Sequence, residues 1–307
     1  MREEKIVIGE KYPLDGMLTL PEVGEKFPAV VLVHGSGSSD MDSKIYAVTP
    51  FKDIAEGLAK LGVATIRYDK RTFTHGRQVL KDYKKNITVN EETIEDAIFA
   101  KELLQKDVRI NPNQIYVAGL SLGGLLAPRM TAEGDFAGTI ILAGSPRRIE
   151  EAIMDQQNEF LANSKGLIKW LGSKQIAKMH EKFKNIDNMT DEEAMNTKFV
   201  GGTTYYYKKE MASKPARNYL ENSDKPVLVM HGERDVQVSL KKDFEAYKEI
   251  LVNHPDATFK LYPGLGHVFT KTENTQVSKA LKDFKRPGQT VEPVVIKDIA
   301  EWVIARG

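Results

Sequence analysis

The stretch that decides the fold runs from residue 115 to residue 123 and reads Ile-Tyr-Val-Ala-Gly-Leu-Ser-Leu-Gly. Its first half is an apolar run of the kind that forms a buried strand. Its second half has the pattern Gly-x-Ser-x-Gly, in which a strand turns sharply into a helix and a serine stands at the tip. Glycines are needed there because the turn leaves no room for a β-carbon. We therefore predict that Ser121 is a covalent nucleophile above the edge of a sheet.

The pattern by itself does not decide this, because a serine can also merely cap the following helix. A nucleophile of this type requires an acid and a histidine later in the chain, in that order. Asp235 follows an apolar strand and is predicted to be the acid, with Glu233 as its nearest competitor and an ordinary turn aspartate as the alternative. His267, in the glycine-rich segment 262–267, is the one histidine of six with the right order and loop.

Backbone N–H groups that stabilise negative charge on a reacting oxygen are expected at two places. Leu122, directly after the nucleophile, opens a helix and is predicted to supply one of them. Ser36 is predicted to supply the other, with Gly37 as the alternative, and Gly35 and Gly37 are expected to contact the substrate. The loop after residue 33 is not expected to bind phosphate, because no Gly-Lys-Ser/Thr follows it. It is not expected to bind a dinucleotide either, because the third glycine of that motif is missing. His34 is expected to pack beneath the site.

Strands and helices alternate along most of the chain, which predicts an α/β fold with a mostly parallel sheet covered on both faces. The predicted strands are 29–33, 63–68, 115–118, 139–143, 226–230 and 258–262, after an edge hairpin over 6–20 that turns near Asp15 and Gly16. The predicted helices are 51–61, 92–105, 122–132, 240–251 and 294–305.

The alternation stops at residue 146 and resumes after residue 223, and the intervening segment has helical patterns without a convincing strand. We predict a core of residues 1–145 and 224–307 with a helical cap, 146–223, over the carboxyl edge of the sheet.

Several cap and loop residues are candidates for substrate contacts. Trp170, Tyr205 and Tyr206 could line an aromatic pocket for an acyl or alcohol group, although packing within the cap is the favoured alternative. Lys70 and Arg71 could bind a substrate carboxylate, although an ion-paired loop that braces the cap is favoured.

The composition excludes several classes of function. The 307 residues carry a formal net charge of +1, so neither nucleic acid nor an anionic membrane is expected as a partner. The absence of cysteine excludes disulfides, thiolate nucleophiles and cysteine-ligated zinc. No signal-peptide layout and no membrane-spanning apolar run are evident, so we expect a soluble, cytoplasmic protein. A homodimer is left open.

With these residues in view, the chain resembles the α/β-hydrolase fold, and more narrowly the bacterial serine esterases whose first loop reads H-G-S-G-P-x-D-R-D. Residues 34–42 follow this loop except for Ser38 in place of proline and Met41 in place of arginine. Four further stretches match, and the last has glycine at position 266 where the family commonly has asparagine: 67–71, 122–129, 232–238 and 262–267. The resemblance spans about residues 28–302.

This resemblance implies a carboxylesterase that acts on short acyl or aryl esters without metal or cofactor. Our hypothesis is therefore an enzyme in which Ser121, His267 and Asp235 hydrolyse a small-molecule ester through an acyl-enzyme. A thioesterase, acyltransferase or peptidase could use the same residues, because the fold hosts all of these activities. A ligand-binding protein without catalysis is the least favoured alternative, since no member of the catalytic set is missing.

Overall fold

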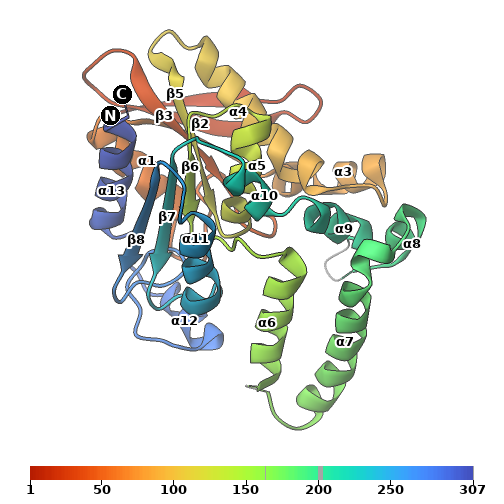
Figure 1. Ribbon diagram of the computed structural model, residues 1–307. Coiled ribbons are helices and arrows are strands. Elements are labelled where there is room, and N and C mark those ends of the chain that lie inside the picture. The colour runs from red at the N-terminus through yellow and green to blue at the C-terminus, as the bar shows by residue number, and fades with distance from the viewer. Residues whose placement is uncertain (163, 200–202, 307) are drawn as a thin grey trace.

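The computed structural model describes residues 1–162, 164–199 and 203–306, and its centre is one eight-stranded sheet (Figure 1). The strand order is β1-β2-β4-β3-β5-β6-β7-β8. The first two neighbour pairs are antiparallel and all later pairs are parallel. The strands are β1 (Arg2–Ile8), β2 (Leu14–Leu20), β3 (Phe27–Val33), β4 (Ala64–Tyr68), β5 (Ile110–Leu120), β6 (Thr139–Leu142), β7 (Val227–Gly232) and β8 (Ala257–Tyr262).

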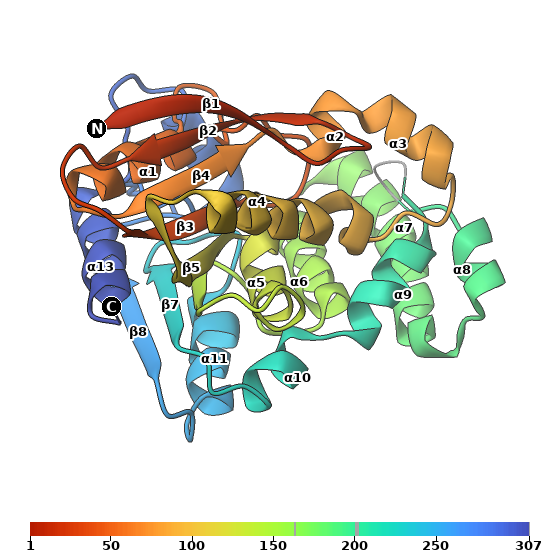
Figure 2. The same cartoon turned by 90° about the horizontal axis from the view of Figure 1, so that it is seen from above.

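Helices cover both faces of this sheet, because the central strands are apolar on both sides. In β3, Val31 and Val33 face α4 (Glu95–Lys106) and α5 (Leu122–Glu133). Val30 and Leu32 face the opposite layer, formed by α1 (Pro50–Lys60) and α13 (Pro293–Ile304). The two helix layers are seen on either side of the sheet in Figure 2. The predicted α/β class with a mostly parallel sheet is confirmed.

Between β6 and β7 the described residues form a series of helices. The helices are α6 (Ile149–Ala162), α7 (Gly166–Lys184), η2 (Ile186–Asn188), α8 (Asp191–Asn196), α9 (Tyr205–Ser213) and α10 (Ala216–Glu221). Of these, α6 to α9 stand away from the sheet in Figure 1, while α10 packs beside α5. These helices have a small apolar core of their own, formed by Phe183, Ile186, Ala194, Tyr205 and Ala212. None of the helices described in the chain is both long enough and apolar enough to cross a membrane.

Some local expectations were wrong. The edge hairpin turns between Ile8 and Leu14, where Gly9 has a φ of 75°, and Gly16 lies inside β2. A glycine is required at position 16 because a β-carbon on this residue would come within 2.7 Å of the Arg67 carbonyl oxygen.

Several helical segments were not anticipated from the sequence. Each is short or only partly periodic, so hydrophobic spacing gives a weak signal for it. They are α2 (Arg71–Thr74), α3 (Gly76–Tyr83), η1 (Asn90–Ile94) before α4, and α12 (Val277–Asp283); the predicted helix over 240–251 is divided into η4 (Leu240–Phe244) and α11 (Glu245–Ile250).

The turn from β5 into α5 is packed so closely that its glycines cannot be replaced without movement. A β-carbon on Gly119 would lie 2.1 Å from the Gly123 carbonyl oxygen. A β-carbon on Gly123 would lie 2.5 Å from the carbonyl oxygen of Val33, at the end of β3. Both neighbours are backbone atoms, which cannot rotate away as a flexible side chain could.

We therefore expect Gly119→Ala to lower the free energy of unfolding by at least about 2 kcal/mol, since overpacking of this kind forces backbone shifts. Urea denaturation measures the change. Gly76→Ala is the matched control, because a β-carbon on Gly76 meets nothing within 4 Å. Equal stability of the two variants would contradict the close approach at this turn.

Candidate active site

Ser121 stands at the tip of the turn between β5 and α5 in a strained backbone conformation, with φ 57° and ψ −114°. Such a conformation is rare for a residue with a side chain and persists only where the surroundings hold it. Here the Ser121 N–H donates to the Leu142 carbonyl at 2.9 Å, and its own carbonyl accepts from the Leu125 N–H at 3.0 Å. The hydroxyl is thus presented by a rigid backbone at the carboxyl edge of the sheet.

Asp235 and His267 form a hydrogen-bonded pair on the loops after β7 and β8. His267 Nδ1 lies 2.7 Å from Asp235 Oδ2, and the Asp235 side chain is completely buried. The other carboxylate oxygen accepts from the backbone N–H groups of Gln237, at 2.7 Å, and Val238, at 3.0 Å.

These contacts keep Asp235 ionised. Burial alone would raise its pKa, but the charge and hydrogen bond of His267, together with the Val238 N–H, outweigh burial and lower it. An ionised carboxylate only accepts hydrogen bonds, so Nδ1 of His267 is the donor and Nε2 is left to accept a proton.

A cavity of about 100 Å³ opens beside Ser121. Its wall is mostly apolar and includes both residues predicted to supply backbone N–H groups to a developing charge, together with one lysine from α9. The lining residues are Ser36, Ser121, Leu122, Leu125, Ser145, Ile149, Ala152, Ile153, Gln156, Lys208 and Val238.

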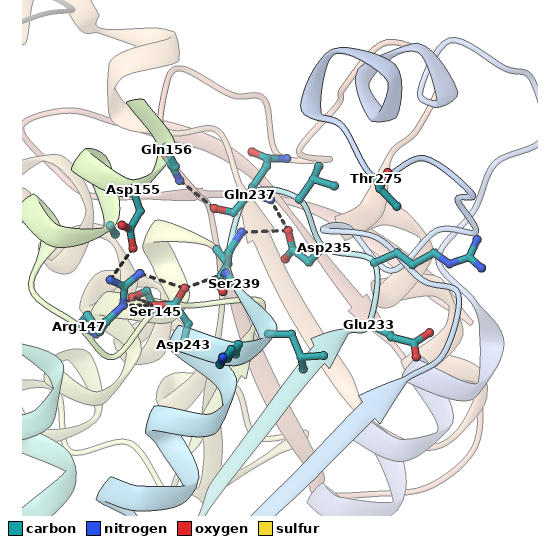
Figure 3. Close-up of a pocket in the computed structure, with 16 residues that line it drawn as sticks. Ser145, Arg147, Asp155, Gln156, Glu233, Asp235, Gln237, Ser239, Asp243 and Thr275 are labelled. Atoms are coloured by element: carbon teal, nitrogen blue, oxygen red, sulfur yellow. Dashed lines mark hydrogen bonds and ion pairs between the residues drawn. The ribbon is translucent and has the colours of Figure 1, made fainter. Parts of the chain in front are cut away.

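A larger cavity of about 410 Å³ adjoins the first, with which it shares Ser145, Ala152, Gln156 and Val238 (Figure 3). Its lining includes Asp235, so Asp235 and Ser121 border two adjoining cavities.

Charged groups in the wall of this larger cavity tie the cap to the core. Arg147 Nε donates to Asp243 Oδ1 at 2.7 Å, and its Nη1 donates to Asp155 of α6 at 2.8 Å (Figure 3). Gln156 of the same helix donates to the Gln237 carbonyl at 3.0 Å.

The loop after β3 lies directly against Ser121. A β-carbon on Gly35 would come within 3.1 Å of Ser121 Cβ, and Gly37 has a φ of 89°. The Ser36 N–H donates to no acceptor in the part of the chain that the structure describes. The Leu122 N–H begins α5 and has no acceptor within that helix. Both groups are available to a ligand in the small cavity.

His34 packs beneath this loop, between the rings of Phe51 and Tyr68. Its Nε2 lies 2.9 Å from the Asp40 carbonyl oxygen and therefore donates to it. Burial, reinforced by the positive charge of Lys70, lowers the pKa of His34 to about 3. The ring is neutral at ordinary pH, and its hydrogen bond to Asp40 connects the two ends of the loop.

Lys70 holds the same loop from the other side. Its Nζ donates to the Gly35 carbonyl at 2.9 Å and lies 3.1 Å from a Glu92 carboxylate oxygen. The Tyr207 hydroxyl of α9 donates to the other oxygen of Glu92. A chain of contacts thus runs from the cap through Glu92 and Lys70 to the loop beside Ser121. Sequence reasoning missed Glu92 and Tyr207, because no motif or spacing links them to the loop.

These contacts disfavour the binding of a substrate carboxylate by Lys70 and Arg71, which was the less favoured interpretation. Both side chains are only 2% exposed. Arg71 pairs with Asp96 at 2.5 Å and with Glu95 at 2.9 Å, inside the fold. The favoured interpretation, an ion-paired loop that braces its surroundings, agrees with these contacts.

An aromatic substrate pocket in the cap, the less favoured interpretation of Trp170, Tyr205 and Tyr206, also finds no support in the cavities that the described residues define. Tyr205 is buried against Phe183 and Phe199 in the core of the cap, and Tyr206 packs against the same cluster. Trp170 is 56% exposed on α7, under the ammonium group of Lys174. None of the three lines either cavity at the nucleophile.

The contacts of Lys70 predict that Lys70→Met lowers kcat for an ester substrate at least about tenfold, because the loop that presents Ser36 loses its anchor. Steady-state kinetics well below the unfolding temperature measure this change separately from stability. Lys60→Met, at the exposed end of α1, serves as the control. A variant with lowered thermal stability but an unchanged kcat would show that Lys70 supports the fold only.

The lowered pKa of His34 predicts a specific acid sensitivity. The unfolded chain binds a proton at this ring near pH 6.5 while the folded chain does not, so stability is retained above pH 6.5 and lost as the pH falls toward 3. Between pH 7 and pH 5 the wild type should lose about 2 kcal/mol more than His34→Gln. Urea denaturation at both pH values measures the free energy of unfolding of each protein. An equal loss of this free energy in the wild type and in His34→Gln would refute the prediction.

Comparison of the sequence with known proteins assigns the chain to a family. The BD-FAE family matches residues 17–250 of the chain. Esterase EstD of Thermotoga maritima is 32% identical over 292 residues, which are 95% of this chain and 65% of that protein. The chain therefore spans slightly less than two thirds of the length of this curated relative.

Solved structures share the fold at low sequence identity. Est1E from Butyrivibrio proteoclasticus superimposes with a TM-score of 0.61 at 18% identity, over 98% of each chain. An esterase from Pyrobaculum calidifontis gives a TM-score of 0.58 at 18% identity, over 100% of this chain and 86% of that one. The resemblance to α/β-hydrolases is confirmed, and the chain belongs to the BD-FAE family within the α/β-hydrolase fold.

Proposed function

We propose that this protein is a serine carboxylesterase that hydrolyses esters with short acyl groups. The observation that carries the proposal is the buried Asp235–His267 pair, with a hydrogen bond of 2.7 Å, at the same sheet edge as the strained Ser121. The name of the Thermotoga maritima relative, an esterase, supports the same activity.

In the proposed reaction, Ser121 Oγ attacks the ester carbonyl carbon while His267 Nε2 takes the hydroxyl proton. Asp235 remains ionised and stabilises the imidazolium that forms. The N–H groups of Ser36 and Leu122 donate to the oxyanion of the tetrahedral intermediate. The imidazolium then protonates the leaving alcohol, and water activated by His267 releases the acid from Ser121.

The size of the cavity supports a short acyl group over an aryl one. The cavity beside Ser121, of about 100 Å³, is much smaller than the adjoining cavity of about 410 Å³, which favours a short acyl group at Ser121. The adjoining cavity of about 410 Å³, which is larger and lined mostly by polar and charged residues, would accept the alcohol portion. No metal or cofactor takes part in the proposed steps.

The test is hydrolysis of p-nitrophenyl esters from acetate to laurate. Ser121→Ala should lose turnover by a factor of order 10⁶, and Asp235→Asn by roughly 10⁴, because the histidine then takes the wrong tautomer. We expect the shortest esters to give the highest kcat/KM.

Ser173→Ala, an exposed serine on α7, is the matched control and should retain full activity. Activity that survives in Ser121→Ala would overturn the assigned nucleophile. Wild-type protein that hydrolyses none of the esters would overturn the proposed function.

A further inference from the structure

One charged side chain in the small cavity has no role in the proposed hydrolysis. Lys208, on the cap helix α9, lines the cavity together with Ser121 and Leu122. The rest of the wall consists mainly of aliphatic side chains from α5 and α6. An ammonium group is an unexpected component of such a wall, because removing a charge from water is costly unless a partner compensates.

Lys208 has no ion-pair partner of its own among the residues that the structure describes. Its Nζ lies 5.0 Å from the ring centre of Phe199 and 4.9 Å from that of Tyr207, which hold it in place without neutralising it. By contrast, the next residue, Lys209, pairs with Asp191 at 2.6 Å.

The nearby carboxylate is already engaged. Glu92 is paired with Lys70 at 3.1 Å and accepts the Tyr207 hydroxyl. The single negative charge of Glu92 balances only one of the two lysines, Lys70 and Lys208. One positive charge next to the cavity is therefore not compensated. Burial lowers the pKa of Lys208 to about 8, with Glu92 opposing and Lys70 adding to this effect. Lys208 is therefore still mostly protonated at pH 7.

We propose that Lys208 is a specificity residue that selects esters whose short acyl group ends in a carboxylate. The acyl group would bind in the small cavity, with its carbonyl at Ser121 and its distal carboxylate on the Lys208 ammonium. Such a ligand supplies the counter-charge that the protein lacks there. A dicarboxylic half-ester with a short acyl chain of about four carbons is a substrate of this kind. This inference rests on the proposed esterase function.

The test compares ethyl hydrogen succinate with ethyl pentanoate, which have similar size but differ in charge, by chromatography of the released acid. The wild type should show at least a tenfold higher kcat/KM for the half-ester, as expected for a hydrogen bond between charged groups. Lys208→Met, which keeps the length of the side chain, should lower this ratio at least tenfold. Lys209→Met is the matched control and should leave the ratio unchanged.

The outcomes separate this inference from the proposed function. If the wild type hydrolyses ethyl pentanoate but does not prefer the half-ester, the specificity role is wrong while the esterase function stands. If Lys208→Met slows both esters equally, Lys208 acts generally and not in selection. If the preference occurs only for an acetate ester of 4-hydroxybutanoate, the carboxylate belongs to the alcohol and the acyl assignment is overturned. If neither ester is hydrolysed, the proposed function itself fails.

Discussion

The close packing of the β5–α5 turn against the end of β3 is the constraint on which the site depends. Gly123 lies so near the Val33 and His34 carbonyls that no β-carbon fits, and Gly119 lies equally near Gly123. This approach places Ser121 beside Gly35 and its loop. Because both segments are backbone held by the central strands, Ser121 and the neighbouring N–H groups are positioned by the sheet itself.

A second layer of interactions depends on buried charges. Lys70 joins the Gly35 carbonyl to Glu92, and Glu92 accepts from Tyr207 of the cap. Each charge is compensated by a neighbour, as burial requires. The same contacts connect the cap to the loop beside Ser121, and Lys208 has no ion-pair partner in the part of the chain that the structure describes.

The sequence allowed the nucleophile, the acid and the histidine to be proposed because local chemistry marks each of them. Ser121 is flanked by the glycines of a sharp turn, and Asp235 and His267 follow apolar strands in the required order. The structure brings Asp235 and His267 into contact and places Ser121 at the same edge of the sheet. Their catalytic roles remain a proposal that kinetics must test.

The substrate contacts could not be predicted in this way. Lys70 and Arg71 follow a strand near the site, yet both turn inward to buried carboxylates, and Tyr205 packs inside the cap. Lys208 has no distinctive sequence context, and it reaches the cavity only because α9 docks beside α5. The sequence alone determined the alternation of strands and helices along the chain and the turn that carries Ser121, since these follow from hydrophobic pattern and glycine sterics. Tertiary structure decided which charges face the ligand, because that depends on how separate helices pack.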